Sequence, residues 1–264
     1  MVVVVLAVAA AVDATSFLCA SVASKEAFKT ANLLKSLTVN ALISGEHGTG
    51  KRSLARYILP DALFFNALEY DEILSALPSC ESIIIYNIEH SPNSEQLFEL
   101  IKQYQVRVIA TTALLEVNER YEEQFSIKIP LPSLQERPED VVMLQEHFTH
   151  EAKNIFGIEK SFDFTKLEVD ISKNAYSLRR QIMMNYLLDD INENELMIIM
   201  ENYLTDKMGS NNDYRNFLHL FEVPLIQAGI KRFKSQLQLS ERLGLNRNTL
   251  RKKISENEPF GLKT

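Results

Sequence analysis

The sequence predicts an α/β fold in which a phosphate-loop core with a mostly parallel sheet precedes two all-α segments. A glycine-rich loop joins the short apolar run 39–44 to the helical run 53–58, which is the strand, loop and helix order of a phosphate-binding unit. Further apolar runs at 83–88 and 106–112 indicate buried strands, and helical apolar spacing dominates after residue 141. Strands that alternate with helices are typical of a parallel sheet.

Length and composition indicate more than one domain. The chain has 264 residues, of which 46% are hydrophobic, so it can bury a core and form one large domain with one or two small ones. We expect an α/β core at 1–140, a helical, lid-like segment at 141–205 and an all-α domain at 214–264. The polar, turn-rich segment 206–213 is the expected linker.

The amino end is apolar without a targeting pattern. Residues 2–12 form an unbroken apolar run, and no Lys or Arg precedes Lys25. A secretory signal has a basic start and a membrane span needs about 18 or more apolar residues in a row, so the run favours a buried strand and we expect no membrane association. Cys19 and Cys80 lie far apart, which predicts neither a disulfide nor a zinc site and suits a cytoplasmic location. The histidines lack persuasive ligand partners, so we predict no metal.

The glycine-rich loop is a candidate site for ATP or ADP. Its glycines let backbone N–H groups turn toward a phosphate, the following helix start adds the positive end of its dipole, and Lys51 can reach the outer phosphates. The generic pattern has Ser or Thr after the lysine to hold magnesium, and here that position is Arg52. The candidate nucleotide-binding residues of this loop are Gly45, Gly48, Thr49, Gly50, Lys51 and Arg52.

Positive charge is concentrated near the carboxyl end. Between Lys231 and Lys253 there are eight Lys and Arg residues and one acidic residue, so this window carries +7, whereas the whole chain carries −7. The rest of the chain therefore carries −14, and a polyanion would be attracted to the tail and repelled elsewhere. This distribution suits a double-stranded DNA-binding module attached to an acidic body.

The same window has the outline of a helix-turn-helix with Gly244 at its turn. Asn246 is a good helix cap, which places the residues after it in the first turn, where recognition helices meet base edges. Arg251 and Lys252 are expected to face the groove or its phosphates, and Lys253 to face the DNA backbone. The leucines expected to pack the motif are Leu237, Leu239, Leu243 and Leu245. The candidate DNA-binding residues are Asn246, Arg247, Asn248, Thr249, Arg251, Lys252 and Lys253.

Most of the chain resembles the bacterial enhancer-binding proteins of the NtrC type, ATP-driven activators of sigma-N RNA polymerase with an AAA+ domain followed by a Fis-type DNA-binding domain. The loop 45–51 is similar to that family's phosphate loop, 106–112 to the strand that ends in its first sensor, and 131–141 to its Pro-Leu-Arg-Glu-Arg stretch. The segment 176–180 is similar to its second sensor. Arg179 stands in the arginine position there, so the resemblance adds Arg179 to the candidate nucleotide-binding residues.

The carboxyl end resembles the Fis-type domain. The segment 217–228 is similar to that domain's long helix, in which an apolar stripe is buried against a partner subunit, so the resemblance implies a homodimer. The family usually has two alanines before the turn, whereas this chain has Leu239 and Ser240. These larger residues stand at a tight helix crossing, where we expect the packing to differ.

Several catalytic positions depart from the family pattern. The family's hydrophobic strand ends in Asp-Glu, which hold magnesium and activate water, and here Tyr86 and Asn87 replace them. The first-sensor Asn falls on Ala113, and no arginine follows Arg120 in the finger region, 121–125. The family's sigma-contacting loop has no counterpart. These departures imply a degenerate AAA+ domain that is not an enzyme and does not remodel the sigma-N polymerase.

Three functions remain open at this stage. We favour a dimeric DNA-binding transcriptional regulator, associated with the nucleoid, whose AAA+ body binds a nucleotide, a transcription or regulatory protein, or both. The second is a weak or partner-assisted ATPase that uses Glu89. The third is an interaction protein in mixed oligomers with an active relative. Lys51 accordingly belongs either to a nucleotide pocket without turnover or to a relic loop.

Overall fold

The computed structural model describes residues 17–114, 121, 123–157, 169–188 and 191–262. The apolar run 2–12, for which the sequence favours a strand, lies outside these residues. The chain divides into two compact units, Met1–Asp190 and Ile191–Thr264. Among the helices of the described residues, none is both long and apolar enough to cross a membrane.

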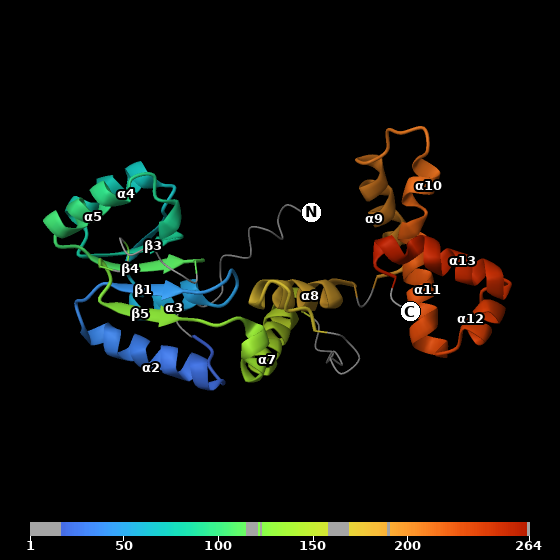
Figure 1. Cartoon of the computed structure of the whole chain (residues 1–264), viewed down its shortest axis with the longest axis horizontal. Helices are drawn as coiled ribbons and strands as arrows, with labels where there is room; N and C mark the ends of the chain where they lie inside the picture. Colours follow the sequence, from blue (N-terminus) through green and yellow to red (C-terminus); the bar gives the residue numbers. More distant parts are fainter. Residues whose placement is uncertain (1–16, 115–120, 122, 158–168, 189–190, 263–264) are drawn as a thin grey trace. The chain divides into compact units, whose positions relative to one another are not determined.

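The first unit is built on a five-stranded sheet in which every paired strand is parallel to its neighbour (Figure 1). The strands stand in the order β2-β3-β4-β1-β5, so β1, which leads into the glycine-rich loop, is flanked by β4 and β5. The predicted α/β class with a parallel sheet is therefore confirmed. The strands are β1 (Ala41–Ser44), β2 (Leu63–Asn66), β3 (Ser82–Tyr86), β4 (Arg107–Thr112) and β5 (Ile127–Pro130).

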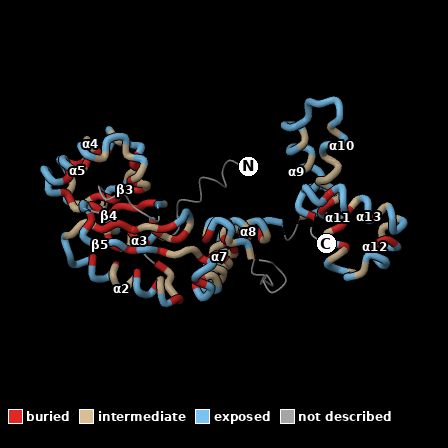
Figure 2. Tube along the Cα trace, viewed as in Figure 1, coloured by how far each residue is buried: buried red, intermediate tan, exposed pale blue. Residues whose placement is uncertain are grey.

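Helices cover both faces of this sheet, and the strands β1, β3 and β4 are its most continuously buried part (Figure 2). Ile84 and Tyr86 of β3 pack toward α2 and α3, whereas Ile83 and Ile85 pack toward α4 and α5. Because successive side chains of a strand point to opposite faces, a strand covered on both sides is apolar at every position. The covering helices are α2 (Val22–Ser36), α3 (Lys51–Ile58), α4 (Tyr70–Ala76) and α5 (Ser94–Gln103), with the short 3-10 helices η2 (Leu77–Ser79), η3 (Ile88–His90) and η4 (Leu134–Glu136).

A pair of helices, α7 (Pro138–Phe156) and α8 (Ala175–Leu188), follows the sheet. Phe148 and Ala152 of α7 are buried against Leu178 and Ile182 of α8. The amphipathic spacing that predicted a helical lid after residue 141 therefore marks the contact between these two helices.

The second unit is all helical. Its largest apolar cluster is formed by the last three α-helices and the residues after them, with Ile226, Leu239, Leu250 and Ile254 among the buried members. The helices are α9 (Glu193–Thr205), α10 (Asp213–Phe217), α11 (His219–Phe233), α12 (Gln236–Arg242), α13 (Arg247–Asn257) and the short 3-10 helix η6 (Glu258–Phe260).

The boundary between the units differs from the one expected from the sequence. Helix α9, expected as the end of the lid, is grouped with the second unit, and none of its residues is buried. The expected linker 206–213 consequently lies inside the second unit, between α9 and α10. Asp213 accepts hydrogen bonds there from the backbone N–H groups of Gly209 and Ser210, at 2.8 and 3.0 Å, so this polar segment forms an ordered turn.

Candidate functional site

The glycine-rich loop follows β1 and leads directly into α3. Gly45, Gly48 and Gly50 all have positive φ, at 148°, 82° and 102°. A Cβ on Gly45 would lie 2.3 Å from the carbonyl oxygen of Leu131, and one on Gly48 would lie 2.5 Å from that of Lys173. Only glycine allows this backbone to come so close to its neighbours.

Each carbonyl of the loop from residue 45 to residue 50 accepts a hydrogen bond. Lys51 Nζ donates to the carbonyls of Gly45 and Glu46, at 2.5 and 2.7 Å. The remaining acceptors are the carbonyls of His47 (from Asn174 Nδ2), Gly48 (from Ala175 N), Thr49 (from Arg137 Nη2) and Gly50 (from Leu54 N). Fixing the carbonyls fixes the peptide planes, and with them the directions in which the loop's N–H groups point.

Lys51 is the buried cation of the site, with 7% of its surface exposed. Burial lowers the pKa of its ammonium to about 8, and the nearby charge of Arg52 acts in the same direction, while Glu89 and Glu46 oppose it. A bound anion would stabilise the charged form of this ammonium, because the anion replaces part of the hydration that the group loses on burial.

A cavity of about 510 Å³ opens between the loop and the lid helices, and every nucleotide-site candidate except Gly45 and Thr49 lines it. Thr49 is buried beside it and donates its hydroxyl hydrogen to the carbonyl of Glu46. Arg179 also reaches the cavity, but its guanidinium forms a double hydrogen bond with the carboxylate of Glu151 on α7, at 2.6 and 2.9 Å. The full lining is His47, Gly48, Gly50, Lys51, Arg52, Ser53, Asn87, Thr111, Phe148, Lys173, Ala175, Tyr176 and Arg179.

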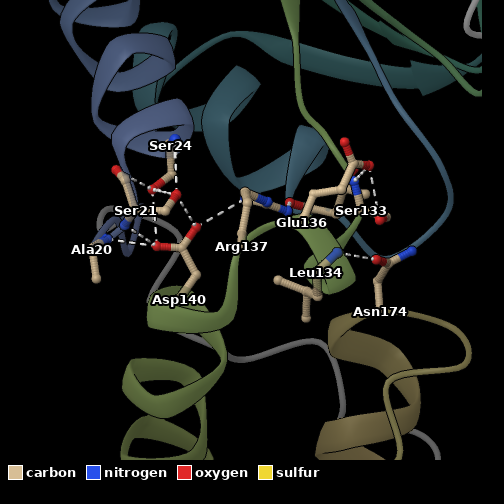
Figure 3. Close-up of polar contacts among 10 residues, drawn as sticks. Ala20, Ser21, Ser24, Ser133, Leu134, Glu136, Arg137, Asp140 and Asn174 are labelled. Carbon is tan, nitrogen blue, oxygen red and sulfur yellow. Dashed lines mark hydrogen bonds and ion pairs between the residues drawn. The ribbon is translucent and has the colours of Figure 1, made fainter.

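A buried polar cluster ties this loop to α2 and α7 (Figure 3). Arg137, 2% exposed, contacts the carbonyl of Thr49 and, at 3.2 Å, the carboxylate of Asp140. Asp140 also accepts hydrogen bonds from Ser21 and Ser24 at the start of α2. Burial by itself raises the pKa of Asp140, but the hydrogen bonds from the backbone of Ser21 and Ala20 and from the two serine hydroxyls outweigh it and lower that pKa.

Asn174 forms the corresponding link to α8. Its side chain accepts from the backbone N–H of Leu134 at 2.6 Å and donates to Glu46 and His47 in the loop. The sequence did not single out Arg137, Asp140 or Asn174. The Arg-x-x-Asp spacing at the start of a helix was the available signal for the first two, since residues three apart share a helix face.

The strand ends beside the loop lack the carboxylates of the resemblance. Tyr86 is buried and Asn87 follows it with φ of 54°. Glu89 lies further along, where one carboxylate oxygen accepts the N–H of Ala113 at 2.8 Å. Within the described residues no group of three or more His, Cys, Asp and Glu side chains could hold a metal ion. Arg120, the last arginine before the finger region, lies outside the described residues.

The second candidate surface lies on α13. Asn246 caps this helix by accepting the N–H of Thr249 at 2.7 Å, as the sequence predicted. Arg247, Asn248, Arg251 and Lys252 are exposed, whereas Leu250 and Ile254 are buried on the opposite side. The helix therefore presents a cationic face to solvent. Thr249 is half-buried.

Two residues of this motif are placed differently from expectation. Lys253 was expected to face the DNA backbone, but its ammonium forms an ion pair with Glu222 of α11. Leu237 was expected to pack the motif with its neighbours, but it is 42% exposed while Leu239 is fully buried. Leu243 and Leu245 are half-buried.

Comparison with known proteins gives a family match at the carboxyl end and similar solved structures for most of the chain. Residues 217–256 match the family model of bacterial regulatory proteins of the Fis family. The structure is similar to NtrX from Brucella abortus in complex with ATP, with a TM-score of 0.55 and 16% sequence identity over 96% of this chain and 72% of that one. The ADP complex of the same protein gives a TM-score of 0.52 and 17% identity over 91% of this chain and 69% of that one. No curated protein matches by sequence.

This chain combines a parallel α/β core, of the fold seen in NtrX, with a Fis-type helix-turn-helix domain. The organisation agrees with the resemblance to NtrC-type enhancer-binding proteins that the motifs indicated. In this core, the glycine-rich loop stands where the resemblance places the phosphate loop, and α7 and α8 stand where it places the lid. In the Fis-type domain, α12 and α13 form the helix-turn-helix, and their match supports DNA binding.

Proposed function

We propose that the protein is a transcriptional regulator that binds duplex DNA as a dimer through its Fis-type domain, while its AAA+ core binds ATP or ADP without turning it over. The observation that best supports DNA binding is the cationic face of α13, on which Arg247, Asn248, Arg251 and Lys252 are exposed. Asn246 caps the start of this helix. Exposed arginines in the first turns of a capped helix suit contacts with base edges and phosphates.

The apolar stripe of α11 supports a dimer. Phe221 is 63% exposed and Leu225 is 41% exposed, and Ala228 continues the same side of the helix one turn later. The opposite side carries Val223 and Ile226 into the core. A helix that is apolar on both sides needs a second partner, and a copy of the same helix would cover the stripe.

Nucleotide binding is supported by the way the phosphate loop is held. A relic loop would not need donors from α3, from Arg137 just before α7, and from Asn174 and Ala175 at the start of α8 to fix its six carbonyls. The absence of turnover is supported by Tyr86 and Asn87, because neither side chain is a carboxylate and neither suits a metal ion or an activated water.

The DNA-binding part is tested with the full chain and short duplexes at about 50 and about 200 mM salt. We expect binding that weakens steeply with salt and that Arg247→Ala or Arg251→Ala reduces by about tenfold or more. Arg215→Ala is the matched control, because Arg215 is an exposed arginine of the same unit on α10. Failure to bind any duplex at the lower salt concentration would refute this part.

The dimer is tested by sedimentation of Phe221→Asp, with Leu237→Asp as an exposed-leucine control on α12. We expect only the change on α11 to give a monomer. A monomeric wild-type protein at micromolar concentration would refute this part.

A weak ATPase is the second candidate, because Glu89 offers one oxygen that is buried and has no hydrogen-bond partner within the described residues. Release of inorganic phosphate that is lost in both Lys51→Ala and Glu89→Gln would favour this alternative. Nucleotide binding without phosphate release favours the regulator.

A further inference from the structure

We infer that the guanidinium of Arg52 occupies the place of the magnesium ion, so that the cavity takes a nucleoside polyphosphate without a divalent metal. The inference rests on the proposed nucleotide binding and adds the chemical form of the ligand. It concerns the free tri- or diphosphate, whose negative charge this chain's own side chains would balance.

Four cationic side chains line the cavity, where a phosphate chain could contact them: Lys51, Arg52, Lys173 and Arg179. Its lining contains no Asp or Glu, and its neutral oxygens come from Ser53, Asn87 and Thr111 among others. Magnesium in such sites is held by one or two carboxylates together with phosphates and water. The donor set therefore fits polyphosphate oxygens and does not fit the metal.

Three carboxylates close to the loop and the lid each hold another group. Glu46 accepts from Asn174 at 3.0 Å, Glu151 binds Arg179, and Glu89 accepts the N–H of Ala113 with one of its two oxygens. Turning Glu46 or Glu151 toward the cavity would break one of these bonds, and Glu89 does not line the cavity. A metal ion brought there would also meet the positive charges of Lys51 and Arg52.

Arg52 is held where it can act on phosphates. Its guanidinium lies over the ring of Tyr86, 4.7 Å from the centroid, and the ring of Tyr86 packs against Phe64 at 5.9 Å. Tyr86 stands in the position where the resemblance places the metal-binding Asp. The ring of Tyr86 thus orients the guanidinium of Arg52 at the strand end where, in the family, a carboxylate holds the metal ion. A guanidinium can bind phosphate oxygens through two parallel N–H donors, which an ammonium cannot do.

Calorimetric titration of the full chain with ATP and with ADP, in EDTA and in excess Mg²⁺, tests the inference. We expect wild-type affinities in the two conditions to agree within about threefold, and Arg52→Gln to weaken binding in EDTA by about tenfold or more. Arg56→Gln is the matched control. Arg56 also stacks on an aromatic ring, that of Phe64 at 3.7 Å, and lies one turn further along α3, but it does not line the cavity. We expect Arg56→Gln to bind like the wild type.

Each remaining outcome is decisive. If the wild type binds nucleotide only with Mg²⁺, the metal-free ligand is ruled out while nucleotide binding itself stands. The same conclusion follows if Arg52→Gln binds in EDTA as tightly as the wild type. If Mg²⁺ strengthens wild-type binding, and Glu89→Gln lowers the affinity in Mg²⁺ to the value measured in EDTA, Glu89 holds a metal ion and the inference is overturned. Absence of binding in both conditions refutes the proposed nucleotide binding itself. Thermal melting of each variant confirms that it is folded.

Discussion

Gly229 of α11 and Leu239 of α12 share one crossing point: a Cβ on Gly229 would lie 2.2 Å from Leu239 Cδ1. The leucine replaces a small residue of the Fis-type pattern, and the glycine opposite it provides the space. The packing at this crossing therefore differs as expected: Gly229 has no side chain where Leu239 needs space. Leu239 is fully buried as a result.

Gly229→Ala is expected to destabilise the second unit by about 1–3 kcal/mol, because the added methyl group overpacks the crossing. Denaturant unfolding measures the change. Gly209→Ala is the control, since a Cβ there would meet nothing within 4 Å. Leu239→Ala should cost less stability in the Gly229→Ala background than in the wild type, because the added methyl group fills part of the space that the leucine leaves. Because alanine favours a helix over glycine by about 1 kcal/mol, a stabilised Gly229→Ala would show that the crossing has room.

The sequence predicted those parts of the protein whose structure depends on residues close together in the chain. The phosphate loop, strands β1, β3 and β4, and the Asn246 cap are local patterns of glycine, apolar runs and a side-chain acceptor. Strands β2 and β5 were not predicted: each has four residues, as β1 does, but no glycine-rich loop follows them to mark a strand. Such short runs by themselves carry no clear apolar period.

Relationships between distant segments could not be predicted in the same way. Arg137 contacts Thr49 across 88 positions, and Lys253 pairs with Glu222 across 31. Which charges face solvent depends on such contacts. The resemblance could place Arg179 near phosphates, but it could not predict that Glu151 binds it. Nothing in one sequence links these pairs before the chain is folded.

Lys252 and Lys253 are adjacent but should respond differently to alanine. The side chain of Lys252 is 76% exposed, and its ion pair with Glu256 is long, at 3.7 Å, and exposed, so Lys252 should stay available to DNA. Lys252→Ala is therefore expected to weaken binding to all duplexes alike and to reduce the salt slope by about one unit. Lys253→Ala removes the partner of Glu222, so it should lower the melting temperature and leave the salt slope unchanged. Salt titrations and melting curves of both variants make the comparison. Equal loss of salt slope in the two would contradict the placement of Lys253.

Lys51 should make nucleotide binding depend on pH. Its pKa of about 8 lies below the ordinary value of 10.5, so between these values the unfolded chain binds more protons and stability rises as the pH increases. A phosphate beside the ammonium favours the charged form, so binding above pH 8 should take up a proton and weaken as the pH rises. Calorimetry in two buffers of different ionisation enthalpy measures that uptake. Lys51→Arg should abolish it, and a wild-type protein without proton uptake would contradict this assignment.

Asp140→Asn should destabilise the first unit by about 3–5 kcal/mol, because it leaves the buried charge of Arg137 without its carboxylate. Glu139→Gln is the control, since Glu139 is an exposed neighbour in the same turn of α7. The pKa of Asp140 is lowered on folding, so its contribution is present above the ordinary value of 3.8 and is lost as the pH falls through the folded value. Urea unfolding at pH 7 measures the difference, and equal stability of the two variants would argue against the cluster.

Glu151→Gln is expected to raise the affinity for ATP more than that for ADP. The carboxylate holds Arg179 through two hydrogen bonds, and a phosphate must compete with it for the same guanidinium. Glutamine keeps the shape but loses the charge, so Arg179 should turn more readily to the outermost phosphate, with a gain of about threefold to tenfold. Glu146→Gln, another change on α7, is the control, because Glu146 does not contact Arg179 in the structure. Parallel titrations with the two nucleotides give the ratio. An unchanged ratio in Glu151→Gln, or a loss of affinity for both ligands, would mean that the Arg179–Glu151 pair fixes the lid and takes no part in phosphate binding.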